Sequence, residues 1–243
     1  MIDVYEPEPA LIDARGLHTF YGASHILHGV DFAVGRGETV ALLGRNGMGK
    51  TTLLRSLLGL TPPRHGNVRI NGVDMTGAPP HRVAREGLAL VPEGRGIFAK
   101  LTVREHLQLA ARLGRHGRMD WTLDRVLDTF PRLAERLHQS GALLSGGEQQ
   151  MLTIGRALMT NPDLIILDEA TEGLSPRLAK EIWAIIRRLR ESRIASVIVD
   201  KNFAVLSALA DHAVLLVKGR VAFAGEPARL KADPALLQRH LGV

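Results

Sequence analysis

The sequence predicts an α/β protein with a largely parallel sheet, because short apolar strands alternate along the chain with helices. The chain has 243 residues, 45% of them hydrophobic and 23% charged, so it is long enough to bury a substantial core in one domain. It contains no cysteine, which excludes disulfides, iron–sulfur clusters and thiolate zinc sites. No apolar run approaches the roughly 18–20 residues that span a bilayer.

The expected elements follow in chain order. Residues 1–10 are acidic and contain proline, and we interpret them as an N-terminal tail and not as a signal peptide; a single domain then covers 11–243. Hydrophobic patterning predicts strands over 26–34, 38–43, 67–73, 88–91, 164–167, 195–199 and 213–217. The same patterning predicts helices over 50–60, over 102–137 with an interruption at 114–117, over about 144–159, and from near Pro176 and Asn202.

The formal net charge is +6, which permits contact with nucleic acid or anionic lipid. However, the arginines are scattered and aromatic residues reach only 4%, so no platform for stacking single-stranded bases is visible. We therefore expect no nucleic-acid partner.

A glycine-rich run links the second expected strand to the first expected helix and fits the pattern G-x-x-x-x-G-K-[ST]. Its glycines let backbone amides turn inward toward phosphates, and the following helix adds its positive N-terminus. Lysine would reach the β- and γ-phosphates, and the threonine hydroxyl would bind Mg²⁺. The predicted nucleotide-binding residues are Gly44, Arg45, Asn46, Gly47, Met48, Gly49, Lys50, Thr51 and Thr52.

Two carboxylates end the apolar strand expected over 164–167. Asp168 is placed to approach the metal ion, and Glu169 to orient or deprotonate an attacking water. An apolar strand that ends in Asp-Glu is common by itself. Behind a phosphate loop it becomes the expected partner, because the charge of a triphosphate needs a metal site.

A third motif, Ser145-Gly146-Gly147-Glu148, opens the helix expected near 144–159. These residues fit an ordinary S-x-x-E capping box. The paired glycines also expose amides beside a helix N-terminus, which favours phosphate binding.

In this order, the three motifs resemble those of the ATP-binding subunits of ABC transporters, and the resemblance extends from about residue 11 to the C-terminus. It implies a P-loop NTPase (RecA-like) core with a flanking antiparallel β subdomain and an inserted helical subdomain over about 99–155, which would dock onto a membrane subunit. It also implies ATP and Mg²⁺ as cofactors.

The resemblance assigns further roles. Tyr21 would stack on adenine, although a turn or core aromatic is the alternative. Thr51, Glu93 and Asp168 would hold Mg²⁺. The family dimerises head to tail, so Ser145, Gly146, Gly147 and Glu148 would act in trans on ATP bound to the opposite subunit.

Four positions depart from the commonest family pattern. Glu93 replaces a glutamine, Ala170 a proline and Ser175 an aspartate. Lys201 stands where a histidine is usual, and lysine is a donor-only cation. We hypothesise that Glu169 is the hydrolytic carboxylate and that Lys201 contacts the γ-phosphate, with a solvated lysine as the alternative.

The runs at 91–95 and 172–176 make the chain similar to one ATP-binding subunit of branched-chain amino-acid importers. That implies two transmembrane permease subunits, a second ATP-binding subunit in a hetero- or homodimer, an indirect periplasmic binding protein, and a place on the cytoplasmic face of the cell membrane. Urea or amide importers, lipid or lipopolysaccharide exporters and soluble assembly ATPases remain alternatives. DNA-repair and condensation ATPases are disfavoured, because no coiled coil or cysteine zinc module is present.

Overall fold

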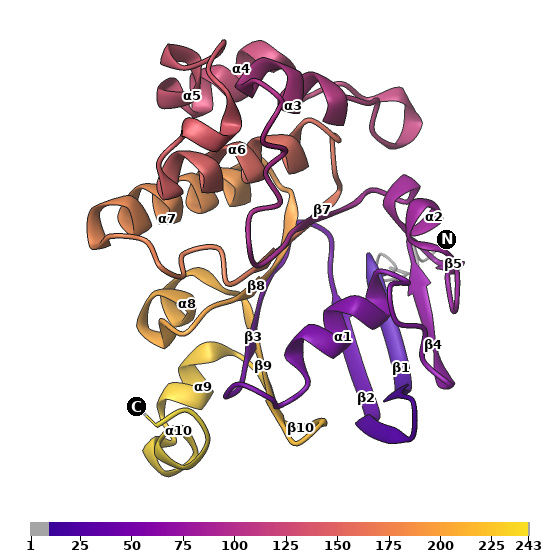
Figure 1. Cartoon of the computed structure of the whole chain (residues 1–243). Coiled ribbons are helices and arrows are strands. Elements are labelled where there is room, and N and C mark those ends of the chain that lie inside the picture. The colour runs from indigo at the N-terminus through magenta and orange to yellow at the C-terminus, as the bar shows by residue number, and fades with distance from the viewer. Residues whose placement is uncertain (1–9, 243) are drawn as a thin grey trace, which may run out of the picture.

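Two sheets organise the protein, seen in a computed structural model that describes residues 10–242 (Figure 1). The predicted tail over 1–10 therefore lies outside the described residues, except for Ala10. A four-stranded antiparallel sheet has the order β2-β1-β4-β5 and a six-stranded sheet the order β10-β9-β3-β8-β7-β6. Within the larger sheet only the β9–β10 pair is antiparallel. The predicted α/β class with a flanking antiparallel β subdomain is confirmed.

The strands are β1 (Ile12–Tyr21), β2 (Ser24–Val34), β3 (Thr39–Leu43), β4 (His65–Ile70), β5 (Val73–Asp74), β6 (Leu88–Val91), β7 (Leu164–Asp168), β8 (Ala195–Val199), β9 (His212–Val217) and β10 (Arg220–Gly225). The helices are α1 (Lys50–Leu57), α2 (Pro80–Arg85), α3 (Val103–Ala110), α4 (Leu123–Thr129), α5 (Pro131–Glu135), α6 (Gly146–Leu158), α7 (Pro176–Glu191), α8 (Phe203–Leu209), α9 (Pro227–Lys231) and α10 (Pro234–His240). Single 3-10 turns lie at Arg115–Gly117 and Gly141–Leu143.

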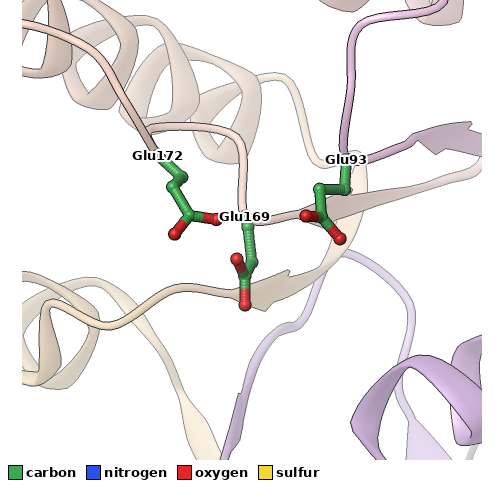
Figure 2. A group of neighbouring side chains, drawn as sticks. All are labelled: Glu93, Glu169 and Glu172. Carbon is green, nitrogen blue, oxygen red and sulfur yellow. The ribbon is translucent and has the colours of Figure 1, made fainter. Parts of the chain in front are cut away.

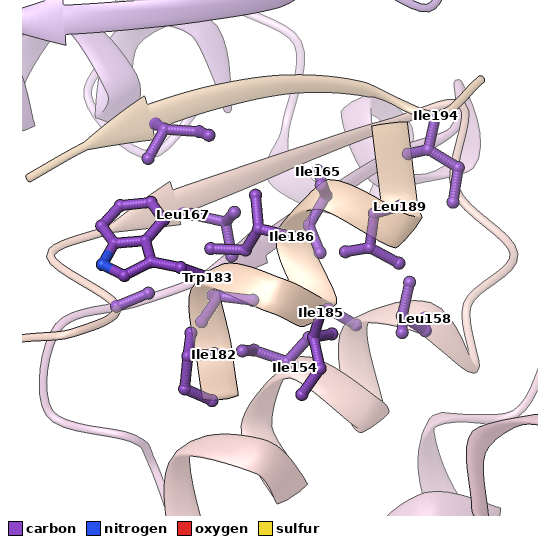
Figure 3. Packing of buried hydrophobic residues seen from close by; sticks show 14 of the residues in the cluster. Ile154, Leu158, Ile165, Leu167, Ile182, Trp183, Ile185, Ile186, Leu189 and Ile194 are labelled. Atoms are coloured by element: carbon purple, nitrogen blue, oxygen red, sulfur yellow. The ribbon is translucent and has the colours of Figure 1, made fainter. Parts of the chain in front are cut away.

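The parallel sheet separates two hydrophobic cores, because successive side chains of a strand point to opposite faces. On one face, Val40 and Leu42 of β3 join α1 and the antiparallel sheet. On the other face, Ala41 and Leu43 join α6 and α7. Figure 3 shows this second core, where Trp183 and its neighbours on α7 pack against β7 and α6.

The structure corrects several expected boundaries. The first helix ends at Leu57 and not at residue 60, since Gly59 adopts a φ of +70°. The strand expected over 67–73 is two strands, β4 and β5, that flank the Asn71-Gly72 turn. β1, β10, α2, α9 and α10 were not expected from the patterning.

The helical subdomain predicted over about 99–155 corresponds to a region that contains α3, α4, α5 and most of α6 (Figure 1). Its boundaries stay a prediction. Over residues 10–242, none of the helices combines the length and the apolar character needed to cross a membrane.

Candidate nucleotide-binding site

The glycine-rich loop joins the carboxyl end of β3 to the first residue of α1, as the sequence predicts. Gly44 has a φ of +142°, and a Cβ atom there would lie 2.5 Å from the Leu216 carbonyl oxygen, so only glycine fits. The Lys50 ammonium donates hydrogen bonds to the carbonyl oxygens of Gly44 (2.7 Å) and Arg45 (3.3 Å). Burial lowers the pKa of Lys50, whereas the nearby Glu169 and Asp168 raise it. The Lys50 ammonium is thus held by two carbonyl oxygens of the phosphate loop.

The turn between β9 and β10 anchors this loop from the other side. The Gly219 amide donates to the Met48 carbonyl (3.0 Å), and the His28 amide of β2 donates to the Gly219 carbonyl (2.9 Å). The Lys218 amide contacts the Met48 sulfur at 3.2 Å. Met48, one of the predicted nucleotide-binding residues, therefore holds the loop in place through its backbone and its sulfur. Thr52 is buried in α1, while Arg45, Asn46 and Thr51 are exposed.

Asp168 and Glu169 lie at the carboxyl end of β7, where the buried strand meets the nucleotide side of the sheet. Asp168 is only 7% exposed, and burial and the charge of Glu93 raise its pKa while Lys50 opposes that shift. The next residue turns sharply, because Glu169 has a φ of +52° and its amide donates to the Val199 carbonyl (2.9 Å). The strained backbone directs the second carboxylate away from the strand.

Three carboxylates converge at this end of the sheet (Figure 2). One oxygen each of Glu93, Glu169 and Glu172 lies within 4.8 Å of the others. A hydrogen bond with Glu172, together with burial and the charge of Glu172, raises the pKa of Glu169 to about 7. Sequence reasoning noticed Glu172 only as part of the run 172–176 and gave it no role, because its contact with Glu169 depends on the turn that follows β7.

Lys201, which follows β8, forms an ion pair with Glu172. This contact raises the pKa of Lys201. Lys201 also lines a cavity of about 330 Å³ with Gly44, Lys50 and Glu169. The structure therefore brings the predicted phosphate loop, hydrolytic carboxylate and histidine replacement to one cavity.

The third motif, Ser145-Gly146-Gly147-Glu148 (the signature motif from here on), forms a capping box at the N-terminus of α6. The Ser145 amide donates to a Glu148 carboxylate oxygen (2.8 Å), and the Glu148 amide donates to the Ser145 hydroxyl (3.4 Å). Arg136 donates to the other oxygen of Glu148 at 2.6 Å, and Glu148 is only 6% exposed. Glu148 thus supports the motif from inside the chain, while Ser145 remains exposed.

Both glycines of this motif lie close to side chains from other segments. A Cβ atom on Gly147 would lie 2.6 Å from a methyl group of Leu178, and one on Gly146 would lie 3.1 Å from the Arg95 guanidinium. The hydroxyl of Ser175 caps α7 by accepting a hydrogen bond from the Leu178 amide (3.4 Å). Ser175 therefore fills a helix-capping position that an aspartate would also suit.

The segment that carries Glu93 is fastened to α6. The Arg95 carbonyl accepts hydrogen bonds from the Thr153 hydroxyl (2.7 Å) and the Arg156 guanidinium (3.0 Å), which also donates to the Gly96 carbonyl (2.7 Å). Hydrogen bonds therefore join the residues just after Glu93 to the helix that begins with the Ser145–Glu148 motif.

Tyr21 is the last residue of β1 and is 46% exposed. It does not line the cavity around Lys50. Leu241, which sequence reasoning did not consider, does line this cavity, and no local signal in the sequence indicated it.

Comparisons with known proteins agree with this geometry. The chain is 40% identical over 224 residues to the high-affinity branched-chain amino acid transport ATP-binding protein BraG of Pseudomonas aeruginosa, covering 92% of this chain and 96% of that protein. It is 32% identical over 239 residues to the lipopolysaccharide export system ATP-binding protein LptB of Escherichia coli K12, covering 96% and 98%. A solved ATP-binding subunit of an ABC transporter superposes with a TM-score of 0.81 at 31% identity, covering 93% and 94%. A family model described as ABC transporter matches residues 27–172, and the chain therefore belongs to the ABC transporter family, whose ATP-binding domains hydrolyse ATP.

Proposed function

We propose that this chain is the ATP-hydrolysing subunit of an importer for branched-chain amino acids. The observation that carries the proposal is the likeness to the Pseudomonas protein, which is 40% identical across nearly the whole of both chains. The runs at 91–95 and 172–176, which the sequence shares with such importers by resemblance, place Glu93 and Glu172 beside Glu169. The two sequence runs that favour this subfamily thus contribute side chains next to Glu169, the proposed hydrolytic carboxylate.

Mg²⁺ is proposed as the cofactor that accompanies ATP. Thr51, Glu93 and Asp168 offer the hydroxyl and carboxylate oxygens that this ion prefers. Burial and the negative charge of Glu93 raise the pKa of Asp168. A cation beside Asp168 would offset both the burial of its charge and the repulsion from Glu93. The charges of Glu93 and Asp168 therefore favour a cation, which would neutralise charge on the β- and γ-phosphates.

Within this site, Lys50 would leave the carbonyl oxygens of Gly44 and Arg45 to contact phosphate oxygens, which are better acceptors for an ammonium. Glu169 would accept a proton from the attacking water. Lys201 would give up its ion pair with Glu172 and would form one with the γ-phosphate instead. Tyr21 is proposed to stack on adenine, from its exposed position at the end of β1.

The exposed Ser145 and the amides of Gly146 and Gly147 would contact ATP on a second ATP-binding subunit, paired head to tail with this chain. ATP-binding subunits of this family work with transmembrane permease components. We propose two permease subunits, docked through the helical region and supplied by a periplasmic binding protein. The chain would then lie on the cytoplasmic face of the membrane.

Capture of the tagged chain from detergent-solubilised native membranes, with mass spectrometry of its partners, tests this assembly. We expect two polytopic permeases and a second ATP-binding subunit, and leucine uptake by cells should fall when this gene is deleted. Recovery of a single permease type together with unchanged leucine uptake would contradict the proposed substrate. Recovery of soluble partners alone would contradict the transport role.

Lipopolysaccharide export is the second candidate, favoured by the 32% identity to the Escherichia coli protein over almost its full length. The same capture experiment separates the two functions. An importer brings down a periplasmic amino-acid-binding protein, whereas an exporter brings down lipopolysaccharide and leaves amino-acid uptake unchanged.

A further inference from the structure

A second cavity, of about 280 Å³, lies at the opposite end of the parallel sheet from the nucleotide site. Arg36 precedes β3, Asp163 precedes β7 and Arg193 precedes β8, so these residues mark the amino ends of the strands. The phosphate loop, Asp168 and Lys201 all follow carboxyl ends. The two cavities are therefore separate sites.

Four arginines and two aspartates line this second cavity, which gives it a formal charge of +2. The residues are Arg36, Arg118, Arg125, Arg193, Asp120 and Asp163. Arg118 forms ion pairs with both Asp163 (3.1 Å) and Asp120 (3.4 Å), and Arg115, which does not line the cavity, forms a second ion pair with Asp163 (3.8 Å). Within the described chain, no carboxylate lies within ion-pair distance of Arg36, Arg125 or Arg193.

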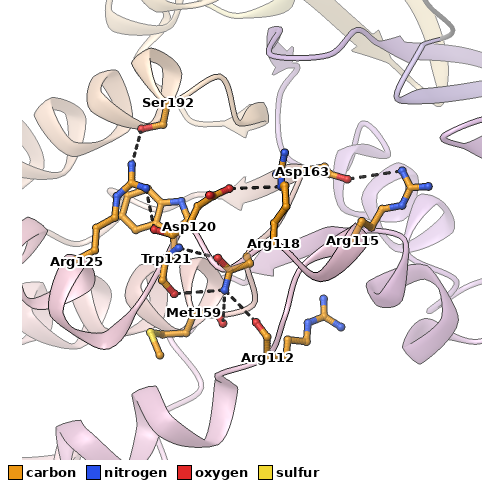
Figure 4. A network of polar contacts seen from close by, with 10 residues as sticks. Arg112, Arg115, Arg118, Asp120, Trp121, Arg125, Met159, Asp163 and Ser192 are labelled. Carbon is orange, nitrogen blue, oxygen red and sulfur yellow. Dashed lines mark hydrogen bonds and ion pairs between the residues drawn. The ribbon is translucent and has the colours of Figure 1, made fainter.

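Arg125 is held in a fixed position on the cavity wall (Figure 4). Its guanidinium lies 4.2 Å from the centroid of the Trp121 ring and donates to the Asp120 carbonyl (2.8 Å) and the Ser192 hydroxyl (3.3 Å). Both acceptors are neutral, so the positive charge is positioned but not compensated. A guanidinium that is already ordered loses little further freedom when it binds an anion.

Asn161, which also lines the cavity, fixes the rest of this wall. Its side-chain oxygen accepts from the Trp121 amide (2.6 Å), and its side-chain amide donates to the carbonyls of Arg112 (2.9 Å) and Trp121 (3.3 Å). Asn161 is 3% exposed and has a φ of +50°. A buried residue thus ties the segment around Trp121 to the loop before β7, and the cavity is preformed.

We propose that this cavity binds a small dianion of the phosphate class, either a free phosphate compound or the headgroup of a phosphate-bearing lipid. Guanidinium groups match phosphate oxygens in geometry and stay charged at every physiological pH. The charge of +2 matches a dianion, and the volume lies just below the usual range for sites of larger small molecules, which suits a small anion. The bound anion would bridge Arg125, in the first turn of α4, and Arg193, in the turn that precedes β8.

Inorganic phosphate, at a mildly alkaline pH where it is a dianion, is the probe for the test, by isothermal titration calorimetry of the full chain. Saturating ADP without Mg²⁺ fills the nucleotide site first, so that the phosphate loop does not compete for the probe. We expect one equivalent to bind and to change the fluorescence of Trp121, which lines the cavity. Arg193→Gln and Arg125→Gln should each weaken binding by about tenfold or more, the value for a lost charge-assisted hydrogen bond.

Arg239→Gln, at an exposed arginine of α10 outside the cavity, is the matched control and should leave the affinity unchanged. Arg193 makes no side-chain hydrogen bond or ion pair within residues 10–242, so its variant should fold even if the Arg125 variant does not. Sedimentation with phosphatidic acid vesicles, compared with phosphatidylcholine vesicles, separates a lipid source from a free anion. Failure of both probes to bind, or equal binding by wild type and Arg193→Gln, would overturn the proposal.

Discussion

Replacing Glu148 by alanine removes the carboxylate that closes the N-terminus of the signature helix α6. The Ser145 amide would lose its partner at 2.8 Å, and Arg136 would lose its partner at 2.6 Å. A lost helix cap costs about 1 kcal/mol. A lost hydrogen bond to a charged group costs about 1.5–3 kcal/mol, and the 45% exposure of the Arg136 side chain favours the lower end of that range.

We therefore expect Glu148→Ala to lower the free energy of unfolding by about 2–3 kcal/mol. Glu148→Gln keeps an acceptor for Ser145 but loses the charge opposite Arg136, so about half of that loss is expected. Urea unfolding measures both values. Glu191→Ala, an exposed carboxylate at the end of α7, is the control and should change the free energy by less than about 0.5 kcal/mol.

The pH dependence provides a second measurement on the same residue. Burial raises the pKa of Glu148, but the hydrogen bonds from Ser145 and Arg136 outweigh it and hold the pKa below the usual value. A carboxylate with a lowered pKa in the folded state stabilises the protein above its unfolded pKa and loses that contribution as pH falls through the folded value. Wild type should therefore lose more stability on acidification than Glu148→Gln. Equal acid dependence, or a Glu148→Ala variant as stable as wild type, would refute the reasoning.

Four further predictions concern the nucleotide site. Glu169→Gln should reduce ATP turnover by about 100-fold or more while nucleotide binding is retained, which separate turnover and binding assays can check. Because the pKa of Glu169 is raised to about 7, kcat/KM for ATP should rise with pH through that region, and Glu172→Gln should move the rise to lower pH; an unmoved profile would contradict the contact. Lys201→Ala should reduce turnover by about tenfold and spare ATP binding, and unchanged turnover would exclude a role at the γ-phosphate. Gly44→Ala should abolish nucleotide binding in a fluorescent-nucleotide titration. A Cβ atom added at Gly47 meets no atom within 4 Å, so Gly47→Ala should destabilise the folded loop only by about 1–3 kcal/mol of backbone strain.

The sequence predicts best the elements whose signals are local. β3, the phosphate loop and the start of α1 follow each other directly, so glycine positions and apolar runs suffice to place them. β8 is predicted over its full observed range, because a buried parallel strand is a continuous apolar run. The capping box at Ser145 is likewise a matter of four consecutive residues.

The sequence does not predict β1, because the pairing of this strand with β2 is irregular. The register with β2 shifts between Ala14 and Leu17 and again between Thr19 and Phe20, which breaks the alternation that marks a strand. β10 was not expected either, since this strand at the edge of the sheet is mostly exposed. In both cases partners far along the chain, and not local patterning, define the strand.

The carboxylate cluster shows the same limit at the site. Glu93 and Glu169 were predicted as separate functional residues from their motifs. The contact between Glu169 and Glu172 depends on the positive φ of Glu169, and the ion pair of Glu172 with Lys201 joins the ends of two strands. The spacing of these residues in the sequence predicts neither the contact between Glu169 and Glu172 nor the ion pair between Glu172 and Lys201.

Hydrogen bonds join α6 to the segment that carries Glu93, so the positions of these two parts depend on each other. Because the Arg95 carbonyl accepts hydrogen bonds from Thr153 and Arg156, a displacement of α6 would also displace the segment that carries Glu93. If ligand binding at Glu93 and the position of the helix are coupled in this way, each would change the equilibrium of the other by the same factor. Part of the free energy of nucleotide binding would then act on α6, at a distance from the bound nucleotide.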